Sequence, residues 1–256
     1  MPHPDPDPWS SLRRHTSARI ALGRAGGSLP TREVLSFSLA HAAARDAVHA
    51  ELDVELLQQT LHTLGVKCLL FSSQASDREI YLQRPDLGRR LDEFSRAALA
   101  DLPASSVDVA LIIADGLSSP AAQRQAPLLL EHLIPRLTAS QITIAPISIV
   151  RQARVAIEDE IGSALGATIA VILIGERPGL GTAHSLGAYL VHNPRPGRND
   201  AERNCISNIR PDGMRREDAA DLLAYLIRES LQRRISGVAL KDERHAVATP
   251  HLKGPL

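Results

Sequence analysis

The chain has few aromatic residues, few cysteines and no net charge. Each of these features excludes particular kinds of core, binding surface or functional site. Only 3% of its 256 residues are Phe, Trp or Tyr, so the core must be aliphatic, built from Leu, Ile, Val and Ala. Basic and acidic residues number 29 each, which gives a formal net charge of zero. This balance argues against the broad positive surface by which proteins bind nucleic acid.

The two cysteines, Cys68 and Cys205, are far apart, and neither belongs to a Cys-x-x-Cys pair. The sequence therefore lacks a zinc or thioredoxin-type motif, and we expect both thiols to stay reduced. No apolar run approaches the roughly 18 residues of a membrane span. Residues Met1–Ser11 lack the apolar core of a secretory signal. We expect a cytoplasmic protein without membrane or nucleic-acid partners.

Aliphatic runs alternate with helical patterns from residue 66 onward. Unbroken apolar strands separated by helices predict a parallel sheet covered on both faces, and right-handed crossovers would make it doubly wound. The predicted elements are strands at Cys68–Phe71, Val107–Ala114, Ile142–Val150 and Ile169–Ile174, and helices at Pro85–Asp101, Gln123–Leu137, Ile157–Leu165 and Glu217–Ile235.

Two further helices are predicted before this alternation begins. One starts at Pro30-Thr31 and runs to about Ala50, and the other runs from Val54 to Leu64 and ends at Gly65. The fold class we predict is therefore α/β, a doubly wound, mostly parallel sheet with an N-terminal helical extension. Its predicted parts are a flexible tail (1–18), the helical extension (19–65), the α/β domain (66–240) and a C-terminal tail (241–256).

Two predicted strands end in unusual loops, Asp115-Gly116 and Gly175–Gly181. Ligands of open α/β sheets bind beyond the carboxyl ends of the strands. The glycines either let a ligand approach the backbone or only permit a tight turn, and both interpretations stay open here. The second loop fits neither Gly-x-Gly-x-x-Gly, because His184 occupies the last glycine position, nor a P-loop, because no lysine follows.

Ala183–Gly187 resembles the nucleophile elbow of serine hydrolases, with alanine in place of the first glycine. Such an enzyme places its serine at a sharp turn directly after a strand, whereas a long loop precedes Ser185. A triad would also need His192, His245 or His251 as its base. A stand-alone α/β serine hydrolase using Ser185 is thus the alternative function. Otherwise we expect Ser185 to cap a helix that continues through Leu190.

The segment from Asn204 to Pro211 is rich in amide and hydroxyl side chains around Ile206 and Ile209. One interpretation is a strand with a polar face, whose amides suit a large ligand. The other is a loop held by its own side-chain hydrogen bonds. Cys205 has no nearby partner in the sequence that would make it nucleophilic, so we interpret it as a contact residue.

Four segments resemble, in the same order, the small subunit of ethanolamine ammonia-lyase. They are 18–31 (ARIALGRAGGSLPT), 154–162 (RVAIEDEIG), 175–187 (GERPGLGTAHSLG) and 200–211 (DAERNCISNIRP). Together they extend over nearly the whole chain. The resemblance implies a larger partner subunit, a TIM barrel that binds ethanolamine and adenosylcobalamin, with this chain covering part of the corrin.

The same resemblance implies a radical lyase whose cofactor carries the difficult chemistry. Homolysis of the cobalt–carbon bond yields an adenosyl radical, and ethanolamine rearranges to acetaldehyde and ammonia. It implies cobalamin contacts at Val155, Glu176 and Cys205, and it places no catalytic or metal-ligating residue on this chain. The family is also associated with bacterial microcompartments through its N-terminus, although the match here is weak before Arg19.

His184 and Gly187 fit part of Asp-x-His-x-x-Gly, a motif whose histidine replaces the lower ligand of cobalamin. Thr182 occupies the aspartate position, so no carboxylate orients the imidazole. We therefore expect the dimethylbenzimidazole of the cofactor to stay on cobalt and His184 not to be a ligand.

Overall fold

The computed structural model describes residues 7–16, 18–103 and 106–244. The first six positions lie outside this range, as does 245–256, which includes most of the predicted C-terminal tail. The described elements are, in order, η1 (Ser10–His15), α1 (Thr31–His49), α2 (Val54–Thr63), β1 (Cys68–Ser72), α3 (Arg78–Gln83), η2 (Leu87–Arg89), α4 (Glu93–Ala100), β2 (Val107–Ala114), α5 (Ser119–Ala139), β3 (Ile147–Arg151), α6 (Ile157–Ala164), β4 (Ala167–Gly175), β5 (Leu186–His192), η3 (Asp200–Glu202), β6 (Arg203–Ile209), α7 (Arg216–Arg233) and η4 (Gly237–Ala239).

The strands of the described chain form a single sheet in the order β1-β3-β2-β4-β5-β6. β1, β3, β2 and β4 are parallel, whereas β5 is antiparallel to β4 and β6 is antiparallel to β5. Ile172 in the middle of β4, for example, pairs with Ile112 on one side and with Tyr189 on the other. The predicted α/β fold with a mostly parallel sheet is confirmed, and two antiparallel strands extend it at one edge.

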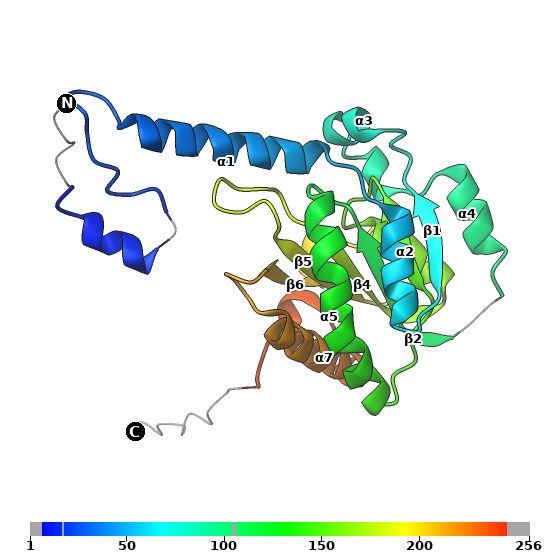
Figure 1. Cartoon of the computed structure of the whole chain (residues 1–256). Coiled ribbons are helices and arrows are strands. Elements are labelled where there is room, and N and C mark those ends of the chain that lie inside the picture. Colours follow the sequence, from blue (N-terminus) through cyan, green and yellow to red (C-terminus); the bar gives the residue numbers. More distant parts are fainter. Residues whose placement is uncertain (1–6, 17, 104–105, 245–256) are drawn as a thin grey trace, which may run out of the picture.

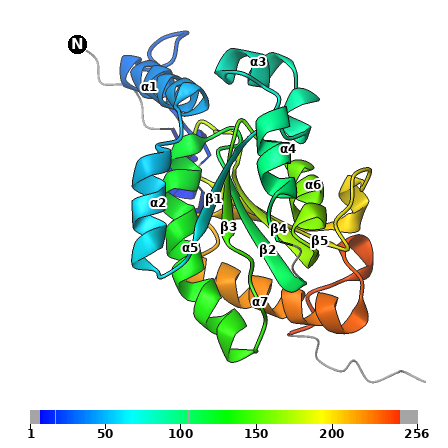
Figure 2. The same ribbon diagram turned by 90° about the vertical axis from the view of Figure 1, so that its right-hand side faces the viewer.

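Helices cover both faces of the sheet (Figure 2), as predicted for a doubly wound fold. α2, α5 and α7 pack on the face that includes Leu111 and Ile113, which we call the α5 face. α4 and α6 pack on the opposite face, which includes Ile112 and Ala114 and which we call the α6 face. All four of these β2 side chains are fully buried. A strand buried on both faces needs apolar residues at every position, which explains the unbroken aliphatic run.

Capping side chains set where the helices between β1 and β2 begin. Asp92 accepts a hydrogen bond from the amide of Ser95, so α4 begins directly after it, and the predicted helix Pro85–Asp101 starts too early. Asp77 caps α3 in the same way. The sequence prediction lacks this helix, because its six residues are too few to show a helical period.

Two other predicted elements keep their place with shifted ends. α5 begins four residues before Gln123, because the hydroxyl of Ser118 accepts a hydrogen bond from the amide of Ala121 and caps the helix there. β3 begins later than the predicted Ile142, because the chain at Ile144 makes only an isolated bridge to β2 before it joins the sheet.

The segment after Ser185 is a strand, and the helix predicted there is wrong. β5 pairs with β4 along its whole length. Ala188 and Leu190 point to the α5 face, while Tyr189 and Val191 point to the α6 face. A period of two is that of a strand. Pairing with β4 decides the conformation here, since leucine and alanine also suit a helix.

α1 extends away from the body of the molecule (Figure 1), and its predicted position is confirmed. Of its 19 residues only Glu33 and Ala47 are buried. Leu35, Phe37 and Leu39 are exposed by 63%, 46% and 73%. No helix in the described part of the chain, α1 included, is long and apolar enough to cross a membrane.

Candidate functional site

The carboxyl ends of β2 and β4 meet with no side chain between them. A Cβ atom on Gly175 would lie 2.0 Å from the carbonyl oxygen of Ser118, and one on Gly116 would lie 2.2 Å from the carbonyl oxygen of Gly175. The amide of Leu117 donates to that same Gly175 oxygen at 2.9 Å. These two glycines therefore permit a close backbone contact, which fixes the point where β4 brings Glu176 to the rim of the sheet.

Glu176 is half-buried and is held by residues from two neighbouring segments. The hydroxyl of Ser185 donates to Oε2 of Glu176 at 2.5 Å, and the amide of Asn208 donates to the same oxygen at 3.2 Å. The backbone amide of Glu176 donates to the carbonyl of Ser185 at 2.9 Å. A carboxylate accepts about four hydrogen bonds, so this one is fixed in position and still has room for further donors.

Cys205 lies on β6 directly opposite Tyr189 of β5, so the two side chains are neighbours on the same face of the sheet. The surrounding protein desolvates the thiol and raises its pKa, and the negative charge of Glu176 adds to the rise. Cys205 is therefore a neutral thiol and not a nucleophilic thiolate. A Cβ atom on Gly187 would lie 3.1 Å from Oε1 of Glu176 and 3.3 Å from the ring of Tyr189, so Glu176 lies beside the Tyr189–Cys205 pair.

Val155 reaches the same face of the sheet from another element. It lies in the turn between β3 and α6, and its half-buried side chain packs against the same apolar cluster as Tyr189. The structure thus places Val155, Glu176 and Cys205 on the α6 face. Glu176 and Cys205 adjoin each other at the edge strands, and Val155 lies at the start of α6.

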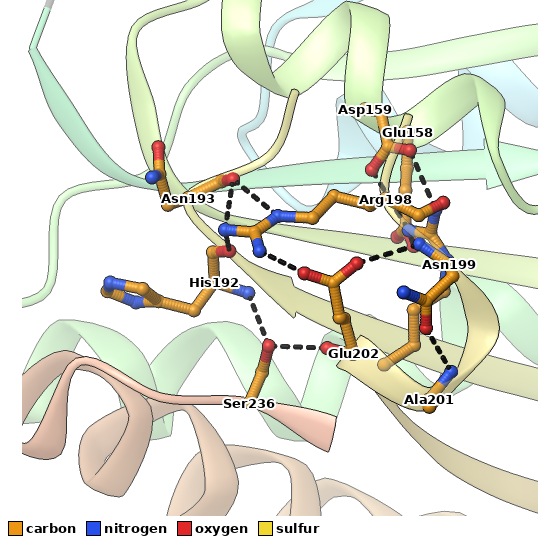
Figure 3. A network of polar contacts seen from close by, with 10 residues as sticks. Glu158, Asp159, His192, Asn193, Arg198, Asn199, Ala201, Glu202 and Ser236 are labelled. Atoms are coloured by element: carbon orange, nitrogen blue, oxygen red, sulfur yellow. Dashed lines mark hydrogen bonds and ion pairs between the residues drawn. The ribbon is translucent and has the colours of Figure 1, made fainter. Parts of the chain in front are cut away.

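A buried group of charges joins α6 to β6 (Figure 3). The guanidinium of Arg203 donates to Glu158 at 2.5 Å and to Asp159 at 2.7 and 3.0 Å, and all three side chains are at most 3% exposed. Burial raises the pKa of both carboxyls, although Arg203 opposes the rise. Arg203 precedes Cys205 by two positions and Glu158 follows Val155 by three, so these ion pairs hold the segments that contain Cys205 and Val155 to each other.

A second, less buried layer of contacts surrounds these charges (Figure 3). Arg198 pairs with Glu202 and donates to the backbone carbonyls of His192 and Asn193. The hydroxyl of Ser236 accepts from the amide of His192 at 2.9 Å and donates to the carbonyl of Glu202 at 2.5 Å. These contacts fasten the β5–β6 connection and the segment after α7 to the edge of the sheet.

The other loop singled out in the sequence, Asp115-Gly116, is engaged in structural contacts. The buried carboxylate of Asp115 accepts from the amides of Gln152 and Ala153 at 2.8 and 3.1 Å. It also lies 3.7 Å from the guanidinium of Arg78. Asp115 therefore ties the end of β2 to the end of β3, which accounts for its place at this strand end.

Ser185 does not have the surroundings of a hydrolase nucleophile. Its hydroxyl donates to Glu176 and not to an imidazole. His192 lies at the opposite end of β5, about 20 Å along the strand. The ring of His184 is engaged by Arg124, at 3.3 Å. Among the residues that the structure describes, no histidine is hydrogen-bonded to Ser185, and the geometry of a triad is not formed.

Sequence analysis assigned no role to Tyr189 or Arg203 and misplaced Ser185 as a helix cap. Tyr189 meets Cys205 only because β5 and β6 pair in one register. Arg203 meets Glu158 and Asp159 because α6 packs on the face of the sheet toward which Arg203 points. A weak signal did exist, because Arg203 adjoins the predicted polar strand, and an arginine that such a strand turns toward the protein needs a carboxylate partner. The adjacent Glu158 and Asp159 were available as that partner.

Nearly the whole chain matches one protein family. Residues 6–241 match the family model of the ethanolamine ammonia-lyase light chain (EutC). The chain is 55% identical over 240 residues to the ethanolamine ammonia-lyase small subunit of Azotobacter vinelandii, which covers 93% of this chain and 89% of the relative. It is 53% identical over 239 residues to that of Ralstonia nicotianae (92% and 88%), and 51% identical over 240 residues to that of Pseudomonas syringae pv. tomato (93% and 84%). The chain therefore belongs to the ethanolamine ammonia-lyase light-chain family, the family of this enzyme's small subunit.

Proposed function

We propose that this chain, bound to a large subunit, encloses adenosylcobalamin while the complex converts ethanolamine to acetaldehyde and ammonia. Membership of the light-chain family supports both the reaction and the need for a larger partner. The observation that carries the enclosing role is the position of Glu176 beside the Tyr189–Cys205 pair on the α6 face. The chain forms part of the wall of the site and has no turnover of its own.

The residues at this position fit a corrin. The macrocycle carries a ring of amide side chains, whose N–H groups need acceptors, and Glu176 is a positioned carboxylate with acceptor capacity to spare. α6 packs on β2 and β4 and leaves Cys205 on β6 exposed. A small, neutral thiol there offers close contact without competing for the metal.

The cofactor, when bound, supplies the radical by homolysis of its cobalt–carbon bond. The residues of this chain bind and orient one edge of the corrin. Glu176 accepts amide N–H groups, and Val155 and Cys205 supply apolar and soft contacts beside it. Covering this edge keeps water from a reactive site, a task that suits a rigid sheet better than a mobile loop.

Replacing Glu176 by glutamine should weaken cobalamin binding to the two-subunit complex by about 1.5–3 kcal/mol, or roughly 10- to 150-fold. The substitution keeps the size of the side chain and removes the charge that strengthens its hydrogen bonds. Equilibrium dialysis of the purified complex against cyanocobalamin measures the affinity directly.

Two variants serve as controls for this measurement. Ser185→Ala removes the internal hydrogen bond to Glu176 but leaves the carboxylate, so its effect on affinity should be the smaller one. Glu131→Gln changes an exposed carboxylate on α5 and should have no effect. An unchanged affinity in Glu176→Gln would remove this residue from the site.

Reconstitution tests the function as a whole. The isolated chain should release no acetaldehyde from ethanolamine, and activity should appear when it is mixed with the large subunit and adenosylcobalamin. A large subunit that reaches the full rate alone would contradict the proposal. Esterase activity of the isolated chain that is lost in Ser185→Ala would instead support the hydrolase alternative.

The exposed side of α1 is the surface we assign to contact with the large subunit. Leu35 and Leu39 lie four residues apart on one side of a helix that extends from the body (Figure 1), and both are exposed. Large exposed apolar patches mark interaction sites. A small subunit binds a larger partner. These side chains are exposed in the isolated chain because the large subunit covers them in the complex.

Leu35→Asn combined with Leu39→Asn should weaken assembly with the large subunit at least tenfold, since each leucine buried at an interface contributes about 1.5–3 kcal/mol. Analytical ultracentrifugation of mixed subunits measures the association. The matched control is Leu56→Asn on α2, where a leucine is also 50% exposed. Normal assembly of the double variant, together with loss of self-association of the isolated chain, would assign this surface to a second copy.

A further inference from the structure

A hollow lies on the α5 face, away from Cys205. It has a volume of about 650 Å³ and is enclosed by α5, the loop before β5 and the turn between β6 and α7. Its charged lining consists of Arg124, Arg210 and Arg216 against a single carboxylate, Asp212. In a chain with zero net charge, this concentration of guanidinium groups from α5 and from the chain between β6 and the start of α7 is a local excess of positive charge.

The imidazole of His184 in this hollow has a defined proton position. Arg124 can only donate, so at 3.3 Å the Nε2 atom of His184 is the acceptor. Burial and the neighbouring Arg124 lower the pKa of His184, which keeps the ring neutral. A neutral ring that accepts at Nε2 carries its proton on Nδ1. Within the part of the chain that the structure describes, that Nδ1 atom is buried and has no hydrogen-bond partner.

Arg216 shows the same lack of an acceptor. Its Nη1 donates to the buried side chain of Gln125 at 3.2 Å, but its buried Nε has no partner. The side-chain oxygen of Gln123 is also buried and unpaired. A buried polar group without a partner is unfavourable, because it has lost its hydrogen bonds to water. Two donors and one acceptor left unpaired around one positively charged hollow indicate a missing ligand.

We propose that this hollow is a binding site for a phosphate monoester. Phosphate oxygens accept from the Nδ1–H of His184 and the Nε–H of Arg216, while Arg124 and Arg210 neutralise the charge. The O–H of a monoprotonated phosphate donates to the oxygen of Gln123, which a carboxylate cannot do. The site is distinct from the proposed cofactor contacts, because its lining includes neither Val155, Glu176 nor Cys205.

The apolar part of the lining extends this assignment to the organic portion of the ligand. Pro127, Leu128 and Pro211 border the hollow beside the charged groups. A volume of this size accommodates a small organic molecule and not only an inorganic ion. The class of ligand is therefore an organic phosphate whose anionic end lies between the arginines and whose less polar body rests on the prolines and leucine.

The test uses inorganic phosphate as the probe and the full two-subunit complex as the receptor. Isothermal titration calorimetry should show phosphate binding at one site per small subunit, and acetate should bind at least tenfold more weakly. Arg216→Gln and Arg124→Gln should each weaken phosphate binding about tenfold or more. Arg228→Gln, on an exposed face of α7, should leave it unchanged.

A second measurement does not depend on arginine variants that could perturb folding. Phosphate should shift the NMR resonances of the His184 ring in the unaltered chain, assigned by comparison with His184→Gln, and should leave the ring of His41 on α1 unmoved. Absence of that shift overturns the proposal. So does phosphate binding to the isolated chain that is lost in the complex, because the hollow would then be part of the subunit contact.

Discussion

Arg203→Met should destabilise the folded chain by about 3–5 kcal/mol, a large fraction of the stability of a typical domain. The guanidinium satisfies two carboxylates, Glu158 and Asp159, in a place where neither is more than 3% exposed. Methionine fills a similar volume but leaves both carboxylates buried without a partner. The cost comes from those two unpaired groups, since replacing a whole buried ion pair by apolar residues is often harmless.

This destabilisation should shrink as the pH falls. Burial raises the pKa of Glu158 well above its ordinary value of 4.5, and removing Arg203 takes away a charge that opposes the rise. A carboxyl with a raised pKa in the folded state binds a proton more readily there than in the unfolded chain. The ionised Glu158 carboxylate therefore lowers the free energy of unfolding most at a pH above its raised pKa. This loss diminishes as the pH falls toward 4.5.

Urea unfolding of the variant and the parent at several pH values measures both effects. Arg84→Met is the matched control, because Arg84 pairs with Asp86 at the surface, where both side chains are 58% exposed. That variant should unfold like the parent. Adding Glu158→Gln and Asp159→Asn to Arg203→Met should restore part of the stability. If Arg203→Met and Arg84→Met had the same free energy of unfolding, the buried ion pairs of Arg203 would contribute nothing to stability.

The strands of the parallel sheet could be predicted because their environment is uniform. β2 and β4 are buried on both faces, so nearly every residue of Val107–Ala114 and Ile169–Ile174 had to be apolar, and short aliphatic runs between helices are readily interpreted. β5 could not be predicted in the same way. Its composition suits a helix as well as a strand, and its conformation follows from pairing with a strand that precedes it by a long loop.

The candidate site was accessible to sequence analysis only in part. The segment from Asn204 had two interpretations, a strand with a polar face or a loop, and β6 shows that it is a strand. The positions of Val155, Glu176 and Cys205 came from the family resemblance and not from any local pattern. The contacts around them, Tyr189 opposite Cys205 and Ser185 and Asn208 on Glu176, depend on the register of two antiparallel strands. Long-range pairing of that kind leaves no trace at a fixed spacing in the sequence.

The second large effect on stability is expected for Gly175→Ala, a substitution that adds a single methyl group. An added Cβ would lie 2.0 Å from the carbonyl oxygen of Ser118 and 2.5 Å from that of Asp115. Both atoms belong to the backbone, so no side-chain rotation relieves the clash, and the end of β4 must separate from the turn after β2. Overpacking of this kind costs about 3 kcal/mol. It would also displace Glu176, the next residue, and so lower cobalamin affinity in the complex.

Gly179→Ala provides a control within the same loop. A Cβ there would meet nothing within 4 Å, and Gly179 is not among the residues with positive φ. This variant should unfold in urea and bind cyanocobalamin like the parent, whereas Gly175→Ala should be weakened in both measurements. Equal behaviour of the two variants would mean that the glycines of this loop serve only as flexible connection. The two substitutions add the same methyl group four residues apart. Lower stability and lower cobalamin affinity in Gly175→Ala alone would therefore mean that the close backbone contact between β2 and β4 sets the position of Glu176.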